Sequence, residues 1–313
     1  MSLIVSSLTD FASNNGPKLF QAALWKNSLT SICKPYQATG AAFDIPLISS
    51  TPVIQAGGTC GTDKSGTTTI TNVQVSLCKC LVAGDWCVNG LKDKYTAQYI
   101  TPDMNETESL GQMSEDIFTS VIDKVAVKVE KGLWGNETEI NVTLGCNGIK
   151  QLIENTAYSA SVTTVNFTGV TEALSGATTA SNVMARVDEL VAAYSIDSTS
   201  MPSTLFVTPT VYKYFLSALK TLNLYHYKPE EVLTGMEIPG SMGIYIRPQV
   251  GLTDNKKWYL TWDQNIAPVF NKLGADSEIS VEKGLGRKLD YYMEWKQGVE
   301  ILYPTQLVYG VQP

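Results

Sequence analysis

The chain has 313 residues, of which 44% are apolar and only 17% are charged, whereas ordinary soluble domains carry about 25% charged residues. This composition excludes intrinsic disorder, which needs low hydrophobicity and high charge, and the length allows one large domain or two modest ones. The formal net charge of −7 argues against a protein that holds nucleic acid through a clustered basic face. The single histidine, His226, leaves little for imidazole chemistry.

The N-terminal residues 1–41 show no strong periodicity and are predicted to form an extended arm, with a short helix around 17–26. They contain no basic segment followed by an apolar run of the kind that marks a signal peptide. No later run approaches the roughly 20 apolar residues that a membrane-spanning helix needs. We therefore expect a protein that is made in a cytoplasm and does not contact a membrane.

Residues 42–82 are predicted to form a long β-ribbon. Two β-rich stretches flank a glycine-rich tip, and Pro46 and Pro52 confine the first stretch to an edge or an irregular ribbon. The second stretch, from Thr67 onward, is rich in β-branched residues and is the stronger strand. Because an isolated two-stranded ribbon is marginal in water, we expect it to lie on another surface.

Residues 114–133 give the clearest helical pattern. Ser114 is the expected N-cap, acidic residues follow it, and lysines lie near the C-terminal end, which matches the helix dipole. The apolar residues recur every four positions and predict one packing face, formed by Ile117, Val121, Val125, Val129 and Leu133.

The rest of the chain mixes helices and short strands, so the predicted fold class is α+β. Helices are expected at 148–157, at 181–195, and from Pro209 to about Leu222 with Thr208 as N-cap. Strands are expected in three short segments, in two longer segments around Gly284, and after Pro304; the short segments are 243–252, 257–263 and 267–271.

Neither the cysteines nor the glycine-rich tip predicts a catalytic or metal site. Cys78 and Cys80 share one face of a strand and are interpreted as small hydrophobes, while a metal or redox role for Cys78, Cys80 and Cys87 is the alternative left open. The segment 58–65 superficially resembles a phosphate-binding loop, but Asp63 replaces its second glycine and a strand follows instead of a helix. The sequence therefore predicts no cofactor, no metal, no catalytic residue and no enzyme.

The order of the elements resembles a known family. The chain resembles tailed-bacteriophage major capsid proteins of the Hong Kong 97 fold. The resemblance lies in the order of an arm, a ribbon, a long helix ending at 132–136, an α+β middle with the segment 205–212, and a strand-rich return through 298–304. The resemblance implies an extended E-loop at 42–82, an axial domain of 148–271 and 301–313, and a peripheral domain of 83–147 and 272–300 whose spine helix is 114–133.

The resemblance also implies a function. A protein of this family is the major head protein, which self-assembles as pentamers and hexamers into an icosahedral shell, encloses phage double-stranded DNA without reading its sequence, and resides in the virion after assembly in the host cytoplasm. Portal and scaffolding proteins are the implied partners. Because no long charged N-terminal segment is visible, the resemblance implies a separate scaffolding protein or none. The ribbon tip is the implied assembly contact, through Gly57, Gly58, Thr62, Asp63, Lys64 and Ser65.

Three other hypotheses remain at the level of sequence. The first is the shell protein of an encapsulin-like bacterial compartment, which shares the fold. The second is a virion tail or surface-binding protein, which needs strands in place of the helices at 181–195 and 209–222. The third is an enzyme that uses cysteine or nucleotide chemistry around Cys60–Cys87.

Overall fold

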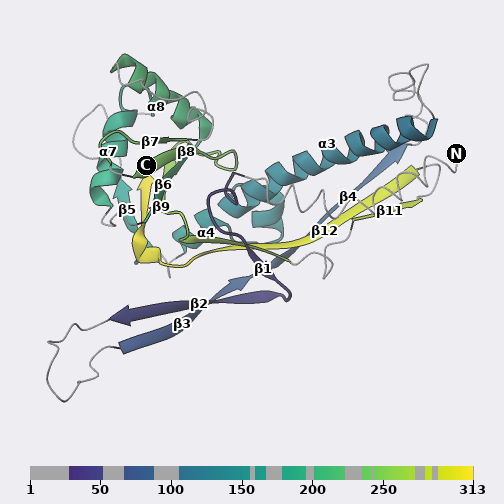
Figure 1. The fold of residues 1–313 in the computed structure, drawn as a ribbon, viewed down its shortest axis with the longest axis horizontal. Coiled ribbons are helices and arrows are strands. Elements are labelled where there is room, and N and C mark those ends of the chain that lie inside the picture. The colour runs from purple at the N-terminus through teal and green to yellow at the C-terminus, as the bar shows by residue number, and fades with distance from the viewer. Residues whose placement is uncertain are drawn as a thin grey trace, which may run out of the picture.

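The structure is a computed structural model that describes residues 28–51, 67–87, 106–155, 159–166, 178–194, 201–222, 235–241, 243–271, 279–283 and 288–312. These residues form a five-stranded sheet, a six-stranded sheet and a separate two-stranded ribbon, together with one long helix and several short ones (Figure 1). The predicted α+β class is confirmed.

The ribbon consists of β2 (Ala42–Thr51) and β3 (Thr67–Ser76), which pair antiparallel from Ala42 opposite Ser76 to Thr51 opposite Thr67. It is shorter at its root than the predicted 42–82, because β2 begins at Ala42 and leaves β3 without a partner strand beyond Ser76. After Leu77 the chain continues as β4 (Cys78–Cys87), which belongs to the five-stranded sheet. The far end of the ribbon extends away from both sheets (Figure 1).

The five-stranded sheet is built around the long strand β12 (Lys288–Ile301). One edge of β12 pairs with β4, and its other edge pairs with β11 (Ile279–Lys283) and β10 (Ile266–Asn271). The strand β1 (Tyr36–Ala38) adds to β10 in parallel. The structure differs from the sequence-based expectation at two places. The end of the expected arm forms a strand of this sheet. The strand β10 pairs with β12 and not with the strands of the expected axial segment.

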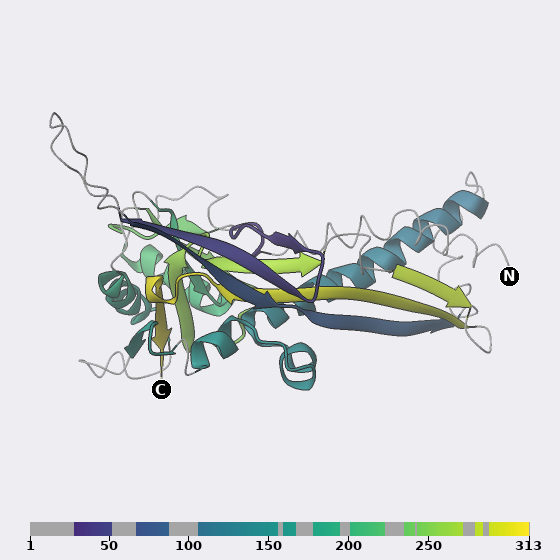
Figure 2. The same ribbon diagram turned by 90° about the horizontal axis from the view of Figure 1, so that it is seen from below.

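The helix α3 (Glu106–Trp134) runs along β4 and β12 (Figures 1 and 2). It begins eight positions before the predicted start at Ser114. The segment 106–113 is rich in Glu, Leu, Gln and Met, which are good helix formers, and their summed propensity outweighs the roughly 1 kcal/mol cost of Gly111. With 29 residues the helix is about 44 Å long.

The six-stranded sheet has the order β5 (Thr163–Asn166), β13 (Leu307–Val311), β9 (Lys257–Trp262), β6 (Ser203–Val207), β8 (Ile244–Pro248) and β7 (Met236–Glu237). The helices α7 (Val183–Ala193) and α8 (Pro209–Thr221) cover the face turned away from α3 (Figure 1). The hydroxyl of Thr208 accepts a hydrogen bond from the Val211 amide, so the predicted cap and helix start are confirmed.

The opposite face of the six-stranded sheet packs against the C-terminal end of α3 and the short helix α4 (Ile149–Glu154). Trp134 is fully buried there, with its ring centroid 5.3 Å from that of Phe206 and 5.4 Å from that of Tyr259. Side chains of α3, of the five-stranded sheet and of the six-stranded sheet therefore belong to one continuous hydrophobic core.

Candidate assembly surface

The two faces of the ribbon differ in what they contact. On one face, Phe43, Ile45 and Val75 pack against Val269 and Leu302 of the body. Gly298 of β12 allows this close approach, because a Cβ atom there would lie 2.5 Å from the Ser76 carbonyl oxygen. This face fixes the root of the ribbon to the five-stranded sheet.

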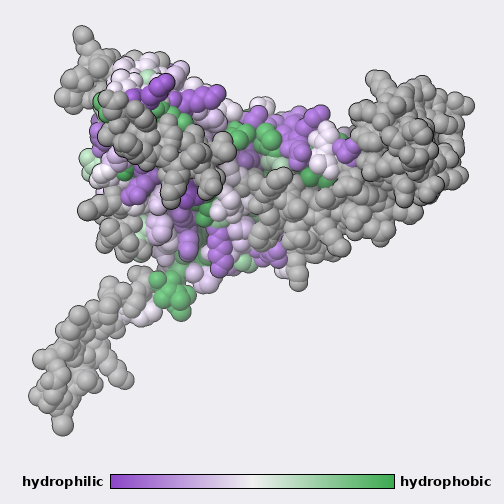
Figure 3. All heavy atoms as spheres, turned by 45° about the horizontal axis from the view of Figure 1, so that its top comes forward, coloured by the Kyte–Doolittle hydropathy of each residue, from purple (hydrophilic) through white to green (hydrophobic). Residues whose placement is uncertain are grey.

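The other face of the ribbon carries an exposed apolar pair. Ile48 and Ile70 lie directly opposite each other across the two strands and are 65% and 68% exposed. Their neighbours on the same face are Pro46 opposite Asn72, both exposed. Hydrophobic surface is visible on the projecting ribbon in Figure 3. Both aliphatic side chains keep most of their water contact in the described structure, so a neighbouring molecule that covered this face would bury them further.

The ribbon tip expected as the assembly contact, from Gly57 to Ser65, lies outside the described residues. The expected packing face of α3 lies within them. Its residues line the side of the helix that faces the sheet: Ile117, Val125, Val129 and Leu133 are buried and Val121 is partly buried.

The outward face of the five-stranded sheet is charged, with two partly exposed apolar side chains, Leu81 and Tyr292, among the charges. Asp85, Asp290 and Glu282 are direct cross-strand neighbours on three adjacent strands, β4, β12 and β11. The Lys288 ammonium lies 2.6 Å from the Asp85 carboxylate, and its hydrogen bond lowers the pKa of that carboxyl. A second ion pair joins Lys79 to Glu294 at 2.7 Å.

Glu130 connects α3 to the N-terminal part of the described chain. Its carboxylate is buried and accepts hydrogen bonds from the Ser28 hydroxyl at 2.6 Å, the Ser28 amide at 3.2 Å and the Gly251 amide at 3.0 Å. Gly251 is required at this position, because a Cβ atom would lie 2.5 Å from Cδ1 of Trp134. One carboxylate thus holds three segments of the chain together.

Replacing Glu130 by glutamine is expected to lower the free energy of unfolding by about 1–3 kcal/mol, since the amide group has only one acceptor oxygen and a buried N–H loses its partner. Chemical denaturation of the full chain measures the change. Glu139→Gln is the matched control: its carboxylate is exposed and bonded to Lys128 at 2.7 Å, a surface pair that contributes about 0–1 kcal/mol. Equal losses in the two variants would contradict the anchoring role of Glu130.

The cysteines depart from the predicted interpretation. Cys78 is bonded to Cys146 in a disulfide, while Cys33 and Cys80 are buried free thiols. The interpretation of Cys78 as a small hydrophobe is therefore wrong, and the redox role that was left open applies to this residue. The interpretation of Cys80 as a small hydrophobe agrees with its burial. The side chains of Cys60 and Cys87 and the whole of His226 lie outside the described residues.

Within the described residues no group of His, Cys, Asp or Glu side chains is arranged to hold a metal ion. No helix of the described chain is long and apolar enough to cross a membrane. The helices α7 and α8 occupy the positions where the alternative of a tail or surface-binding protein requires strands.

Comparison with known proteins gives similarity at the level of structure. No protein-family model and no curated protein matches the sequence. The capsid subunit of the native GTA particle superposes with a TM-score of 0.59 at 13% identity, over 90% of this chain and 88% of that chain. The satellite phage P4 procapsid gives 0.56 at 10% identity over 94% and 90%, and the capsid of Myoviridae phage XM1 gives 0.54 at 10% identity over 88% and 86%.

The chain has the tailed-phage capsid fold. The similarity covers the chain nearly end to end, so the predicted Hong Kong 97-like fold is confirmed. The low identity explains why sequence comparison finds no relative.

Two features of the surface were not predicted from the sequence, although one had a usable signal. In the segment 42–51, alternate positions place Ile45 and Ile48 on opposite faces, so an exposed isoleucine was foreseeable once one face was assigned to the body. The partner of Cys78 carries no such signal, because Cys146 is 68 positions away and several pairings of six cysteines are equally compatible with the sequence.

Proposed function

We propose that the chain is the major capsid protein of a tailed phage and that it self-assembles as pentamers and hexamers into an icosahedral shell around double-stranded DNA. The observation that carries the proposal is the fold, shared over about nine tenths of the chain with proteins that are themselves capsid subunits. In this proposal the chain is a structural component of the virion and not an enzyme, and it is assembled in the host cytoplasm.

The ribbon supports the proposal from a second direction. A two-stranded ribbon is marginal by itself, and β2 and β3 pair only with each other in the part of the chain that the structure describes. The exposed pair Ile48 and Ile70 lies on the face turned away from the body. A neighbouring copy that covers this face would bury both side chains and support the ribbon.

The segments receive roles by position. We assign the ribbon, with the tip from Gly57 to Ser65, to contacts between neighbouring subunits. The five-stranded sheet with α3 corresponds to the peripheral domain, and the six-stranded sheet with α7 and α8 corresponds to the axial domain. A portal protein and a separate scaffolding protein are the expected partners of assembly.

The test is the mass of the assembled protein. The full chain is purified after expression with and without a scaffolding protein, and its mass is measured by light scattering while particles are imaged by electron microscopy. Closed particles of uniform diameter are the expected result. A chain that stays monomeric at every concentration, with and without scaffold, would overturn the proposal.

A further inference from the structure

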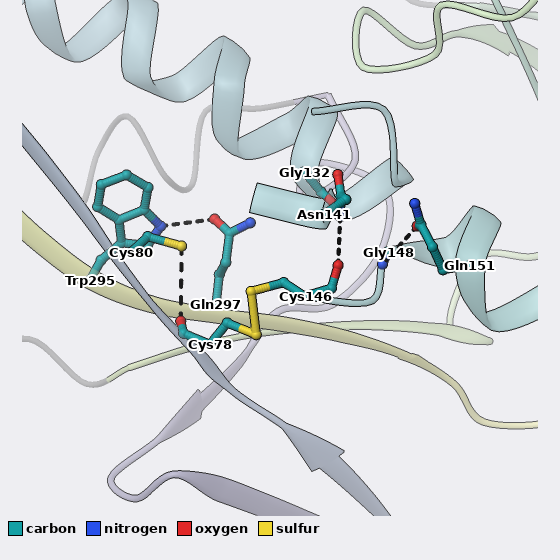
Figure 4. Close-up of a disulfide and its surroundings, with 9 residues drawn as sticks. All are labelled: Cys78, Cys80, Gly132, Asn141, Cys146, Gly148, Gln151, Trp295 and Gln297. Atoms are coloured by element: carbon teal, nitrogen blue, oxygen red, sulfur yellow. Dashed lines mark hydrogen bonds between the residues drawn. A yellow bond between two sulfur atoms is a disulfide. The ribbon is translucent and has the colours of Figure 1, made fainter. Parts of the chain in front are cut away.

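The disulfide between Cys78 and Cys146 lies where the ribbon joins the body (Figure 4). Cys78 is the first residue of β4 and is separated from the last ribbon residue, Ser76, only by Leu77. Cys146 lies in the connection between η1 (Thr138–Thr143), a short π-helix, and α4. The Cα atoms are 5.9 Å apart, a separation that suits a disulfide without movement of the backbone.

The Cys146 side of the bond is held in a rigid framework. The Cys146 carbonyl accepts a hydrogen bond of 2.8 Å from the side-chain amide of Asn141, which also donates to the Gly132 carbonyl at 2.9 Å. Next to it, Gln151 accepts from the Gly148 amide at 3.1 Å and donates to the Gly135 carbonyl at 2.9 Å. Cys146 is therefore fixed relative to the C-terminal end of α3 (Figure 4).

The ribbon side is held by fewer contacts. The buried part of the cluster at its root is small and consists of Ala38, Ile45, Val75, Ala267, Val269 and Leu302. At Leu77 the backbone leaves one sheet and enters another, and its amide donates to the Ala41 carbonyl at 3.0 Å. The ribbon extends from this junction, and the covalent bond at Cys78 fixes the start of β4, which is the body end of the junction.

The remaining described cysteines do not compete for this bond. Cys33 is buried elsewhere in the core. Cys80, two residues from Cys78, is also buried, and burial raises the pKa of its thiol to about 11. Only a thiolate attacks a disulfide, so Cys80 does not exchange with the Cys78–Cys146 bond at neutral pH.

We propose that Cys78 and Cys146 form a redox-controlled restraint at the root of the ribbon: two thiols while the subunit assembles in a reducing cytoplasm, and a disulfide that fixes the start of β4, from which the ribbon extends, after the particle is released. The inference rests on the proposed function for its timing. Closure removes two protons and two electrons from the two thiols, and a small-molecule disulfide such as oxidised glutathione accepts them and becomes two thiols. The reducing cytoplasm keeps the two thiols free, and the oxidising environment outside the cell allows the disulfide to form.

The bond itself is tested on the full chain. The protein is purified under reducing conditions, treated with oxidised glutathione, denatured, alkylated and weighed by mass spectrometry with peptide mapping. Oxidation is expected to protect Cys78 and Cys146 together, and Cys78→Ser and Cys146→Ser are each expected to abolish the protection. Cys80→Ala is the matched control and keeps it. Pairing of Cys78 with any other cysteine, or no pairing, would overturn the proposal.

The restraint is tested by proteolysis of the same samples. Lys79, exposed and directly after Cys78, gives trypsin a site at the junction, and cleavage there requires local opening of β4. Oxidation is expected to slow this cleavage by about threefold or more in the wild type and in Cys80→Ala, and to leave the rate in Cys146→Ser unchanged. Equal rates in the oxidised and reduced wild type would overturn the restraint.

The same comparison on particles separates this proposal from the proposed function. Oxidised wild-type particles are expected to melt about 5 °C or more above reduced ones, with no such difference for Cys146→Ser. Failure to form particles overturns the shell function, whereas the restraint is then decided by the proteolysis of the subunit.

Discussion

Replacing both Ile48 and Ile70 by aspartate is expected to abolish shell assembly and to leave the subunit folded. Burying an isoleucine side chain contributes about 1.5–3 kcal/mol, so losing two weakens each contact by roughly 10²–10⁴-fold. Within the subunit the same side chains are mostly exposed, so the substitution costs little there. The fraction of protein in particles, measured by sedimentation, gives the effect on assembly, and thermal melting of the unassembled subunit gives the effect on folding.

Asn72→Asp is the matched control for the ribbon. Asn72 is exposed on the same face of β3, next to Ile70 in the pattern of alternating side chains. The substitution adds a negative charge without removing an apolar side chain, and particles are expected to form as in the wild type. If the double variant assembles at wild-type concentrations, the exposed pair is not an assembly contact.

Replacing Trp134 by alanine is expected to lower the free energy of unfolding by about 3–5 kcal/mol, the cost of removing a fully buried large aromatic side chain. The indole fills the space between the end of α3 and the six-stranded sheet, against Phe206 and Tyr259. Its loss leaves a cavity at the place where the two sheets share their core. Urea denaturation followed by circular dichroism measures the loss.

Trp134→Phe separates packing from hydrogen bonding. The indole N–H of Trp134 is buried and has no hydrogen-bond partner among the described residues, so phenylalanine removes no bond and keeps most of the aromatic contact. This variant is expected to lose less than half as much stability as the alanine variant. A melting temperature of Trp134→Ala within about 1 °C of wild type would show that the junction tolerates a cavity, contrary to the usual cost of such a truncation.

The parts of the fold predicted correctly from the sequence are those whose causes are local. Thr208 and Pro209 mark the start of α8 through a cap and a fixed backbone angle, and the four-residue spacing from Ile117 to Leu133 marks the buried side of α3. The start of α3 was misplaced because Ser114 has the chemistry of an N-cap, yet the helix formers before it continue the helix through that position.

The parts that the sequence does not predict depend on contacts between distant residues. The ribbon ends at Ser76 because β2 begins at Ala42, and the chain then changes sheet, although the residues from Thr67 to Val82 form one β-rich run. The pairing of β1 with β10 joins residues more than 200 positions apart. Of the candidate site, the ribbon was foreseeable from the sequence, while the pairing of Ile48 with Ile70 and that of Cys78 with Cys146 depend on the three-dimensional structure.

The continuous core through Trp134 has a mechanical consequence for any closed container built from this chain. The five-stranded and six-stranded sheets share one set of buried side chains. Bending between the two sheets would expose these apolar side chains to water and is therefore costly in free energy. In such a container, curvature is expected to change by tilting of whole subunits against their neighbours. The two sheets would move together as one rigid body, and the contacts between subunits would set the radius of the container.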